Sequence, residues 1–369
     1  MFNLSSKFQG FKGKRKGKIW QLFCATDFVS LMYPCFSFCR ILGIFPYKIN
    51  ASIIKTCEPR YILSTIIIGV FCILELINLY DVNKNYAIER DGILSLLERN
   101  FFYIIGGFIV LTTFILSGPR MRFLQTLLEL SSKLPPKSYQ NLSRLIHAKD
   151  IIGFLIIVVR MPIYFSGLPF SVLCKFLMLY IFLLEFIMDM LYINCVCILK
   201  ACFKQINDNL VNLRELVTNS EPYLLSGTYH EQRSAFLLID IISLKRQHLA
   251  ISGAVQTLKM VFSLHILSTI LMTINEIIFN LYYYLMNIHG GIPMNNLQKL
   301  SFYEACITAV TYYSVKMVLI VWACETGKNE AMKIKSTVHD VFNSTNNKQI
   351  KYEIYNYTSL NPIFNHSLI

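Results

Sequence analysis

A membrane-length apolar run near the carboxyl end of the chain passes without a break into a charged segment. The apolar part, residues 302–324, has about the twenty residues that a helix needs to cross a hydrocarbon core. In the charged part, residues 325–342, apolar side chains recur at helical spacing at Ala331, Ile334, Val338 and Val341. The sequence therefore predicts one continuous helix that lies partly in lipid and partly in the cytosol.

Composition places the whole chain in the membrane class. Hydrophobic residues make up 54% of the 369 positions and charged residues only 15%, whereas a soluble domain carries about 25% charge. Six runs are long and apolar enough to be read as spans, namely residues 61–80, 101–116, 151–168, 172–199, 260–286 and 302–324. We therefore predict an all-α, polytopic membrane protein with six spans.

The distribution of Lys and Arg predicts the orientation of these spans. Basic residues gather before the first span, after the second, between the fourth and fifth, and after the sixth, and cytoplasmic connections are where Lys and Arg are retained. The amino terminus is therefore expected in the cytoplasm, and the net charge of +13 reflects topology rather than nucleic-acid binding. We read the basic cluster at residues 12–18 as a solvated cytoplasmic tail, with attraction to anionic lipid as the alternative.

The spans divide the chain into five regions. Residues 202–217 and 234–258 have amphipathic helical spacing, so the fourth and fifth spans should continue as helices beyond the membrane. The expected regions are a cytoplasmic segment with an interfacial helix (1–60), spans one to four (61–199), a cytoplasmic helical region (200–259), spans five and six (260–324), and a cytoplasmic helix with a polar tail (325–369).

The sequence gives no support to an enzyme or a metal site. The eleven cysteines lack zinc or redox spacing, and most lie inside apolar runs, so we expect them to pack as small buried hydrophobes. Neither a Gly-rich phosphate loop nor a nucleophile motif is found, and we predict no cofactor. His265 is expected to be a packed polar residue, because no second metal ligand stands three or four residues beyond it.

Several stretches resemble insect gustatory receptors. They are RILGIFPYKI (40–49), FKQINDNLVNLREL (203–216) and AVTYYSVKMVLIVWACETGKNEAMKIKSTVHDVF (309–342). Residues 244–285 are similar to the fifth-helix region of the fructose-receptor-like and related conserved branches. The inside amino terminus, the short outer loops and the long cytoplasmic helices after the fourth span fit the same family.

This resemblance implies a seven-helix receptor subunit of the plasma membrane of chemosensory neurons. Such subunits assemble as homo- or hetero-tetramers around a central cation pore that opens when a tastant binds. In the family the seventh helix lines the pore, and residues 343–369 are too polar to form it. We therefore expect the chain to end before its pore helix and not to conduct on its own. The alternative is a non-conducting interaction or regulatory subunit for full-length receptors; a secondary transporter is opposed by the lack of an internal repeat.

Polar and aromatic side chains in the outer halves of spans three to six suggest a ligand pocket. Aromatic faces with a few convergent polar groups suit a small sugar-like polyol or a bitter, alkaloid-like tastant. The candidates are Arg160, Tyr164, Tyr180, Glu185, Asn275, Glu276, Tyr282, Thr308 and Tyr312.

Two of these candidates also have structural interpretations. Arg160 is expected to form an internal ion pair with Glu185 or Glu276, because an unpaired buried charge is untenable. Asp189 stands one turn beyond Glu185 on the same helix face and is expected to be hydrated or paired. Tyr282 fits an aromatic belt at the membrane surface.

Overall fold

The computed structural model describes residues 23–50, 53–86, 93–166, 171–218, 227–289, 296–345 and 347–359. The basic cluster at residues 12–18 lies outside these ranges. Within them the chain is almost wholly helical, which confirms the all-α membrane class. One two-stranded hairpin departs from that prediction.

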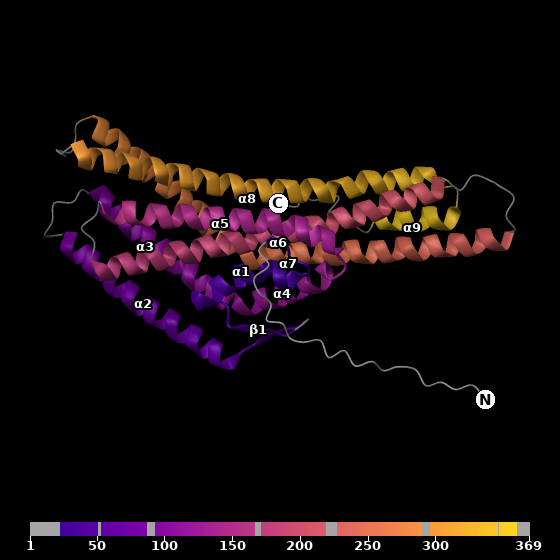
Figure 1. Ribbon diagram of the computed structural model, residues 1–369, viewed down its shortest axis with the longest axis horizontal. Helices are drawn as coiled ribbons and strands as arrows, with labels where there is room; N and C mark the ends of the chain where they lie inside the picture. Colours follow the sequence, from indigo (N-terminus) through magenta and orange to yellow (C-terminus); the bar gives the residue numbers. More distant parts are fainter. Residues whose placement is uncertain are drawn as a thin grey trace.

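Three very long helices form the long axis of the molecule (Figure 1). They are α6 (Val172–Thr218), α7 (Gly227–Ile288) and α8 (Asn296–Ser344), of 47, 62 and 49 residues. At 1.5 Å per residue each is about 70 to 90 Å long, more than twice the thickness of a hydrocarbon core. Helices α6 and α7 thus continue well past the segments predicted as the fourth and fifth spans.

Helix α8 is continuous, as its sequence predicts. Its charged half is not a free tail, because its apolar stripe is buried against the neighbouring helices. Ala331, Ile334, Val338 and Val341 are all at most 3% exposed. The 3.6-residue periodicity thus reports packing within the protein.

Shorter helices complete the bundle: α2 (Glu58–Tyr86), α3 (Ile93–Ile115) and α5 (Pro136–Ser166). Five helices in the described ranges are long and apolar enough to cross a membrane, and they carry five of the six predicted spans: Glu58–Lys84, Ile93–Ile115, Val172–Thr218, Ala235–Ile288 and Phe302–Ser344.

The remaining predicted span, residues 151–168, falls in α5 and is not among those five. Its described part is helical and also holds Arg160. The apolar side chains Ile152, Leu155 and Val159 are each more than half exposed along α5. That exposed apolar face is what a lipid-facing helix presents.

The amino-terminal helix α1 (Phe28–Ile41) begins at a capping box. The Asp27 carboxylate accepts a hydrogen bond from the Ser30 N–H at 2.7 Å, which satisfies one of the free amides at the helix start. Pro34 lies inside the helix. The segment was expected to be interfacial, and its apolar face, including Phe28 and Leu31, is buried within the protein next to α5 and α6.

Two features after α1 were not predicted. Gly43, at φ +73°, supplies a left-handed turn that a residue with a side chain adopts at a cost. The strands β1 (Tyr47–Asn50) and β2 (Ile53–Thr56) then pair antiparallel. The Ile54 N–H donates to the Gln125 side chain at 2.8 Å, which ties this hairpin to the helix that follows α3.

Helix α4 (Ser117–Ser131) occupies what the sequence suggested was a basic loop. Arg120 is buried in it, donates to the Thr113 carbonyl at 3.0 Å, and lies 5.3 Å from the centre of the Phe262 ring. Burial lowers the pKa of Arg120 to about 10, so the guanidinium stays charged at neutral pH. The helix thereby anchors to α3 and α7 through a cation.

Helix α9 (Lys348–Ser359) lies in the segment expected to be a polar tail. It is short and amphipathic. Ile350 and Ile354, one turn apart, are 2% exposed, and the helix packs against α7 and α8. The burial of these two residues explains why a polar, Asn-rich stretch is ordered there.

Glycines allow α3 to approach two neighbours closely. A methyl group at Gly106 would stand 2.7 Å from the Cδ1 of Ile181 in α6, and one at Gly107 would meet the Glu75 carboxylate in α2. Small residues at such contacts let membrane helices pack backbone to side chain. The Gly106–Gly107 pair therefore fixes α3 between α2 and α6.

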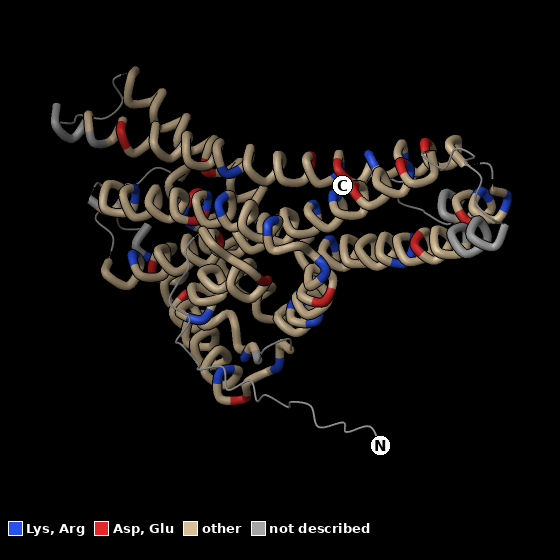
Figure 2. The backbone as a smooth tube through the Cα atoms, turned by 45° about the vertical axis from the view of Figure 1, so that its right-hand side comes forward, with Lys and Arg blue, Asp and Glu red and all other residues tan. Residues whose placement is uncertain are grey.

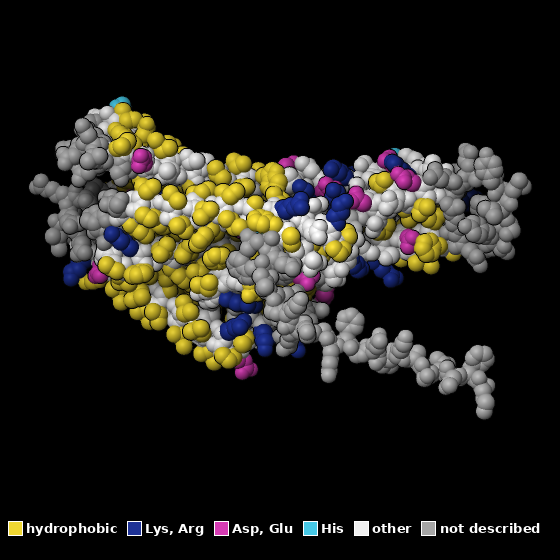
Figure 3. Space-filling view, in the orientation of Figure 1, with side chains coloured by type: hydrophobic (Ala, Val, Ile, Leu, Met, Phe, Trp, Pro, Cys, Tyr) yellow, Lys and Arg dark blue, Asp and Glu magenta, His cyan; other side chains and the backbone are white. Residues whose placement is uncertain are grey.

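The surface divides into an apolar part and a charged part. Figure 3 shows apolar side chains covering the part of the molecule that holds α2, α3, the first halves of α6 and α8 and the second half of α7. Figure 2 shows charged residues sparse there and frequent along the arm, which is formed by the carboxyl-terminal parts of α6 and α8 and the amino-terminal part of α7. Seven of the eleven cysteines are buried, in line with their predicted packing role.

Candidate functional site

Three long helices meet at a buried cluster of ionisable side chains. Each helix contributes two polar residues one turn apart, so that both point to the same side. They are Glu185 and Asp189 on α6, His265 and Thr269 on α7, and Tyr312 and Lys316 on α8. We call Glu185, Asp189, His265, Thr269 and Lys316 the ion network.

Lys316 is the cation at the centre of the ion network. Its ammonium nitrogen lies 2.6 Å from Glu185 Oε1 and 3.0 Å from Asp189 Oδ2. All three side chains are at most 4% exposed. Removing either kind of charge would leave its partner buried and unpaired, which costs about 3–5 kcal/mol.

The second oxygen of Asp189 is satisfied by α7. His265 Nε2 lies 3.0 Å from Asp189 Oδ1, and the Thr269 hydroxyl donates to the same oxygen at 3.3 Å. Asp189 is thus paired, one of the two outcomes expected for it. His265 is a packed polar residue, as predicted, and it pairs with the Asp189 carboxylate. Among the described residues, no three His, Cys, Asp or Glu side chains are placed to hold a metal ion.

Arg160 of α5 lies beside the ion network in an aromatic cage. Its guanidinium carbon is 4.8 Å from the centre of the Tyr313 ring, 5.2 Å from that of Tyr312 and 5.6 Å from that of Phe182. Desolvated contacts of this kind contribute about 2 kcal/mol. Arg160 is also attracted to Glu276, one of its two expected partners, whereas Glu185 is occupied by Lys316.

Next to this cage, α7 carries buried polar atoms with hydrogen-bonding capacity to spare. Thr273 Oγ1, Asn275 Nδ2 and Glu276 Oε2 have no hydrogen-bond partner within the described part of the chain. A buried polar atom without a partner costs about 1–3 kcal/mol. Three of them within one turn of helix are therefore the strongest local indication of a site for a polar molecule.

The structure brings together four of the nine residues predicted for the pocket. Arg160, Glu185, Glu276 and Tyr312 are buried and interact electrostatically across α5, α6, α7 and α8. Asn275 lies on α7 beside Glu276. As it stands the cluster is closed, because each of the four is less than a tenth exposed.

The other predicted residues lie away from the cluster or outside it. The Tyr180 hydroxyl donates to the Leu42 carbonyl at 3.1 Å, and its ring packs on Phe71, so it faces α1 and α2. Tyr282 is 42% exposed. The Thr308 hydroxyl bonds its own helix at the Glu304 carbonyl. The side chain of Tyr164 lies outside the described residues.

Sequence reasoning missed Lys316 and Tyr313. Lys316 stands in the middle of the apolar run 302–324, where an ionisable residue is by itself a signal of function or pairing. Tyr313 is fully buried and is the ring nearest to Arg160. Its neighbour Tyr312 was noticed, but only packing shows that both rings flank the guanidinium.

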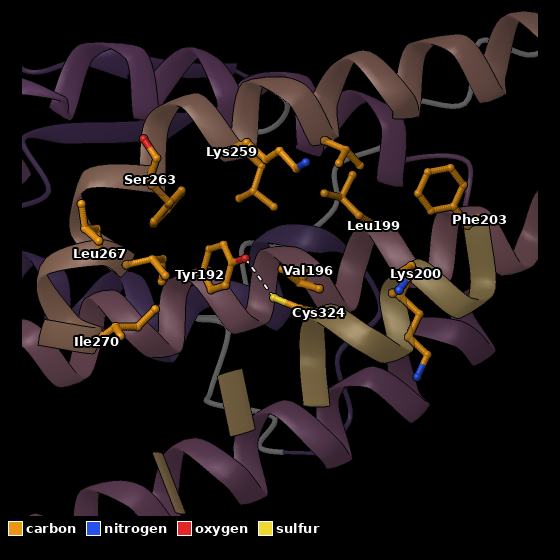
Figure 4. Close-up of a pocket in the computed structure, with 16 residues that line it drawn as sticks. Tyr192, Val196, Leu199, Lys200, Phe203, Lys259, Ser263, Leu267, Ile270 and Cys324 are labelled. Carbon is orange, nitrogen blue, oxygen red and sulfur yellow. Dashed lines mark hydrogen bonds between the residues drawn. The ribbon is translucent and has the colours of Figure 1, made fainter. Parts of the chain in front are cut away.

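A cavity of about 400 Å³ opens further along the same three helices (Figure 4). It is lined by Tyr192, Leu199 and Phe203 of α6 and by residues of α7 and α8 that include Phe262 and Cys324. The Tyr192 hydroxyl and the Cys324 thiol lie 3.1 Å apart at its wall. The cavity is separate from the residues predicted for the pocket.

Comparison with known protein families gives one match, which covers most of the chain. The sequence model described as 7tm Chemosensory receptor matches residues 32–366. A comparison with curated proteins finds no match. The matched range includes every helix of the bundle except the first residues of α1.

Proposed function

This chain belongs to the 7tm chemosensory receptor family, and from that premise we propose that it is a taste receptor subunit that binds a small tastant inside its membrane bundle. A receptor of this kind is a multi-pass membrane protein whose ligand is a small molecule. We place it in the plasma membrane of chemosensory neurons.

The observation that carries the proposed ligand site is the set of unpartnered polar atoms on α7. Thr273, Asn275 and Glu276 offer a hydroxyl, an amide and a carboxylate oxygen within one helical turn. Hydroxyl groups of a sugar-like ligand would satisfy all three types, since a hydroxyl both donates and accepts. The aromatic rings of Tyr312 and Tyr313 supply flat apolar surfaces for the ring of such a ligand.

Access to this site requires the helices to separate, because its residues are buried. We propose that ligand entry takes place between α7 and α8, where Glu276 faces Arg160 and Tyr313. During this separation the ion network would keep α7 and α8 in register with α6. A ligand that binds only the separated state shifts the population toward that state by its differential affinity.

The separation would reach the far end of the molecule through α8. Because α8 is one unbroken helix from Asn296 to Ser344, movement at Tyr312 changes the position of its charged half, which packs within the arm. We propose that this arm is cytoplasmic, in keeping with the cytoplasmic placement of the amino terminus from the positive-inside rule.

We propose further that the subunit acts in a tetrameric, tastant-gated cation channel. The family assignment supports this, and a regulatory subunit of full-length receptors is the second candidate. Whole-cell recording from cells that express the chain alone, during application of fructose, sucrose, caffeine and quinine, tests the first. Tastant-evoked cation current supports a channel-forming subunit.

Silence of the chain alone is compatible with both candidates, so the recording is repeated with a version extended by the seventh helix of a full-length family member. Silence of that version too favours the second candidate. A regulatory subunit should co-purify with a full-length receptor of the family and change its tastant-evoked current when the two are co-expressed. Failure to co-purify with any full-length member, together with silence of both versions, would contradict both candidates.

A further inference from the structure

Three lysines stand around the cavity between α6, α7 and α8, and the described residues that line it include no acidic side chain. The lysines are Lys200, Lys259 and Lys328, one from each helix. Among the sixteen described residues that line the cavity, none is Asp or Glu. We call this cavity, with its three lysines, the lysine groove.

The rest of the lysine groove is apolar. Figure 4 shows the apolar side chains Leu267 and Ile270 at one end, Lys259 near the middle, and Lys200 with Phe203 toward the other end. A volume of about 400 Å³ is in the range of small-molecule sites. The lining therefore suits an amphiphile with an acidic head rather than a free phosphate ion.

The lysines also lie at a definite depth in the predicted topology. Lys200 follows the fourth predicted span, Lys259 precedes the fifth and Lys328 follows the sixth. In the orientation proposed above, all three stand where the hydrocarbon core meets the cytoplasmic headgroups. Anionic lipids are concentrated in that leaflet, and each Lys or Arg near its surface favours them.

We propose that the lysine groove binds an anionic phospholipid, with the headgroup at the three lysines and an acyl chain along the apolar end. The Lys200 ammonium lies 5.5 Å from the centre of the Trp322 ring, which holds it at the charged end. Lys328 is 3.5 Å from Glu325, an exposed pair that restrains this cation only weakly. The site is separate from the tastant site and would hold the inner ends of α6, α7 and α8 together.

The position of Trp322 provides a direct test. The chain has two tryptophans, so Trp20→Phe leaves Trp322 as the only reporter. The full chain is reconstituted in nanodiscs that contain phosphatidylcholine and a small fraction of either brominated phosphatidylglycerol or brominated phosphatidylcholine. Because Trp322 lies beside Lys200, quenching of its fluorescence by bromine reports which lipid stands at that lysine.

We expect half-maximal quenching at an about 25-fold lower fraction of brominated phosphatidylglycerol than of brominated phosphatidylcholine, since each lysine near the surface is worth about fivefold and Glu325 offsets one of the three. The variant with Lys200→Gln, Lys259→Gln and Lys328→Gln should lose this preference. Added inorganic phosphate should not displace the lipid.

A matched control removes three exposed lysines elsewhere, by Lys48→Gln, Lys55→Gln and Lys137→Gln, and should keep the preference. Equal quenching by the two lipids in the unaltered groove would overturn the proposal, and so would equal loss in both triple variants. If the groove variant fails to fold, the proposal is still tested by comparing quenching by the two brominated lipids in the chain that keeps all three lysines. None of these results depends on a tastant response.

Discussion

The ion network and the lysine groove are built from the same three helices a few turns apart, and they use lysine in opposite ways. Lys316 is 4% exposed and contacts two carboxylates, whereas Lys259 is exposed and lines a cavity that no described acidic residue lines. In the network every charge has a partner inside the protein. In the groove, Lys328 has one exposed partner, Glu325, and no described acidic residue lines the cavity itself.

The difference shows that burial and pairing, not residue type, decide whether a charge serves the fold or a ligand. A buried ion pair is retained because removal of one partner leaves the other charge buried and unpaired, which lowers stability more than keeping the pair does. An exposed cation near an apolar groove has no such constraint and is available to an anion. Substitutions in the two regions should therefore differ in their effect on stability.

The largest effect is expected at the centre of the ion network. Lys316→Met leaves Glu185 and Asp189 buried without a cation, so the free energy of unfolding should fall by about 3–5 kcal/mol. Gel filtration after heating measures this. Most of the variant protein should be missing from the monodisperse peak. Lys328→Met, in the groove, is the control and should be tolerated. If Lys316→Met were as stable as Lys328→Met, the distinction between a paired, structural lysine and a groove lysine would be wrong.

A smaller effect is expected from the helix contact at Gly106. Gly106→Ala places a methyl group 2.7 Å from Ile181 Cδ1, which overpacks the interface by about 1–3 kcal/mol. Gly253→Ala is the matched control, because nothing lies within 4 Å of its added methyl group. The melting temperature should fall for the first variant and stay equal or rise for the second.

One hydrogen bond of the ion network can be removed alone. Thr269→Val deletes the 3.3 Å bond to Asp189 while His265 keeps the same oxygen, so the loss should be about 1 kcal/mol. Thr257→Val removes an exposed hydroxyl that bonds only its own helix and should have no measurable effect. A larger fall in melting temperature for Thr257→Val would contradict this assignment.

The smallest effect on stability is expected in the lysine groove. The combined Lys200→Gln, Lys259→Gln and Lys328→Gln variant, purified in a neutral detergent without anionic lipid, should unfold within about 0.5 kcal/mol of the unaltered chain, as surface substitutions usually do. Chemical denaturation measures this. A fall comparable with that of Lys316→Met would show that the groove lysines are structural.

Hydrophobic periodicity was enough to predict the long helices. The stripe Ala331, Ile334, Val338 and Val341 repeats every three or four residues, and the structure buries all four. The same signal was overlooked in α4, where Phe123, Leu124, Leu127 and Leu128 recur at helical spacing and are buried. It is weak in α9, a short, mostly polar helix in which Ile350 and Ile354 are buried. The hairpin was missed since its two strands are only four residues each.

The site could be predicted only in part, because a single sequence does not give the rotation of each helix. Glu185 and Glu276 were identified as costly charges within spans, and both lie in the cluster. Tyr180 and Tyr282 are at similar depths but point elsewhere, toward α1 and α2 in one case and to the surface in the other. Lys316, the partner of two carboxylates, was overlooked inside an apolar run.

The central claim is that a tastant binds at the polar face of α7 beside Arg160. Its most direct test is the tastant-evoked response of Glu276→Gln, measured as a dose–response curve in the expression system in which the unaltered chain responds, alone or with a full-length partner. Gln keeps an acceptor oxygen but not the charge, which weakens a hydrogen bond by about 1 kcal/mol, so the half-maximal concentration should rise about fivefold. Tyr282→Phe is the control, because Tyr282 is exposed away from the cluster. An unchanged curve for Glu276→Gln, with surface expression equal to that of the unaltered chain, would contradict the account.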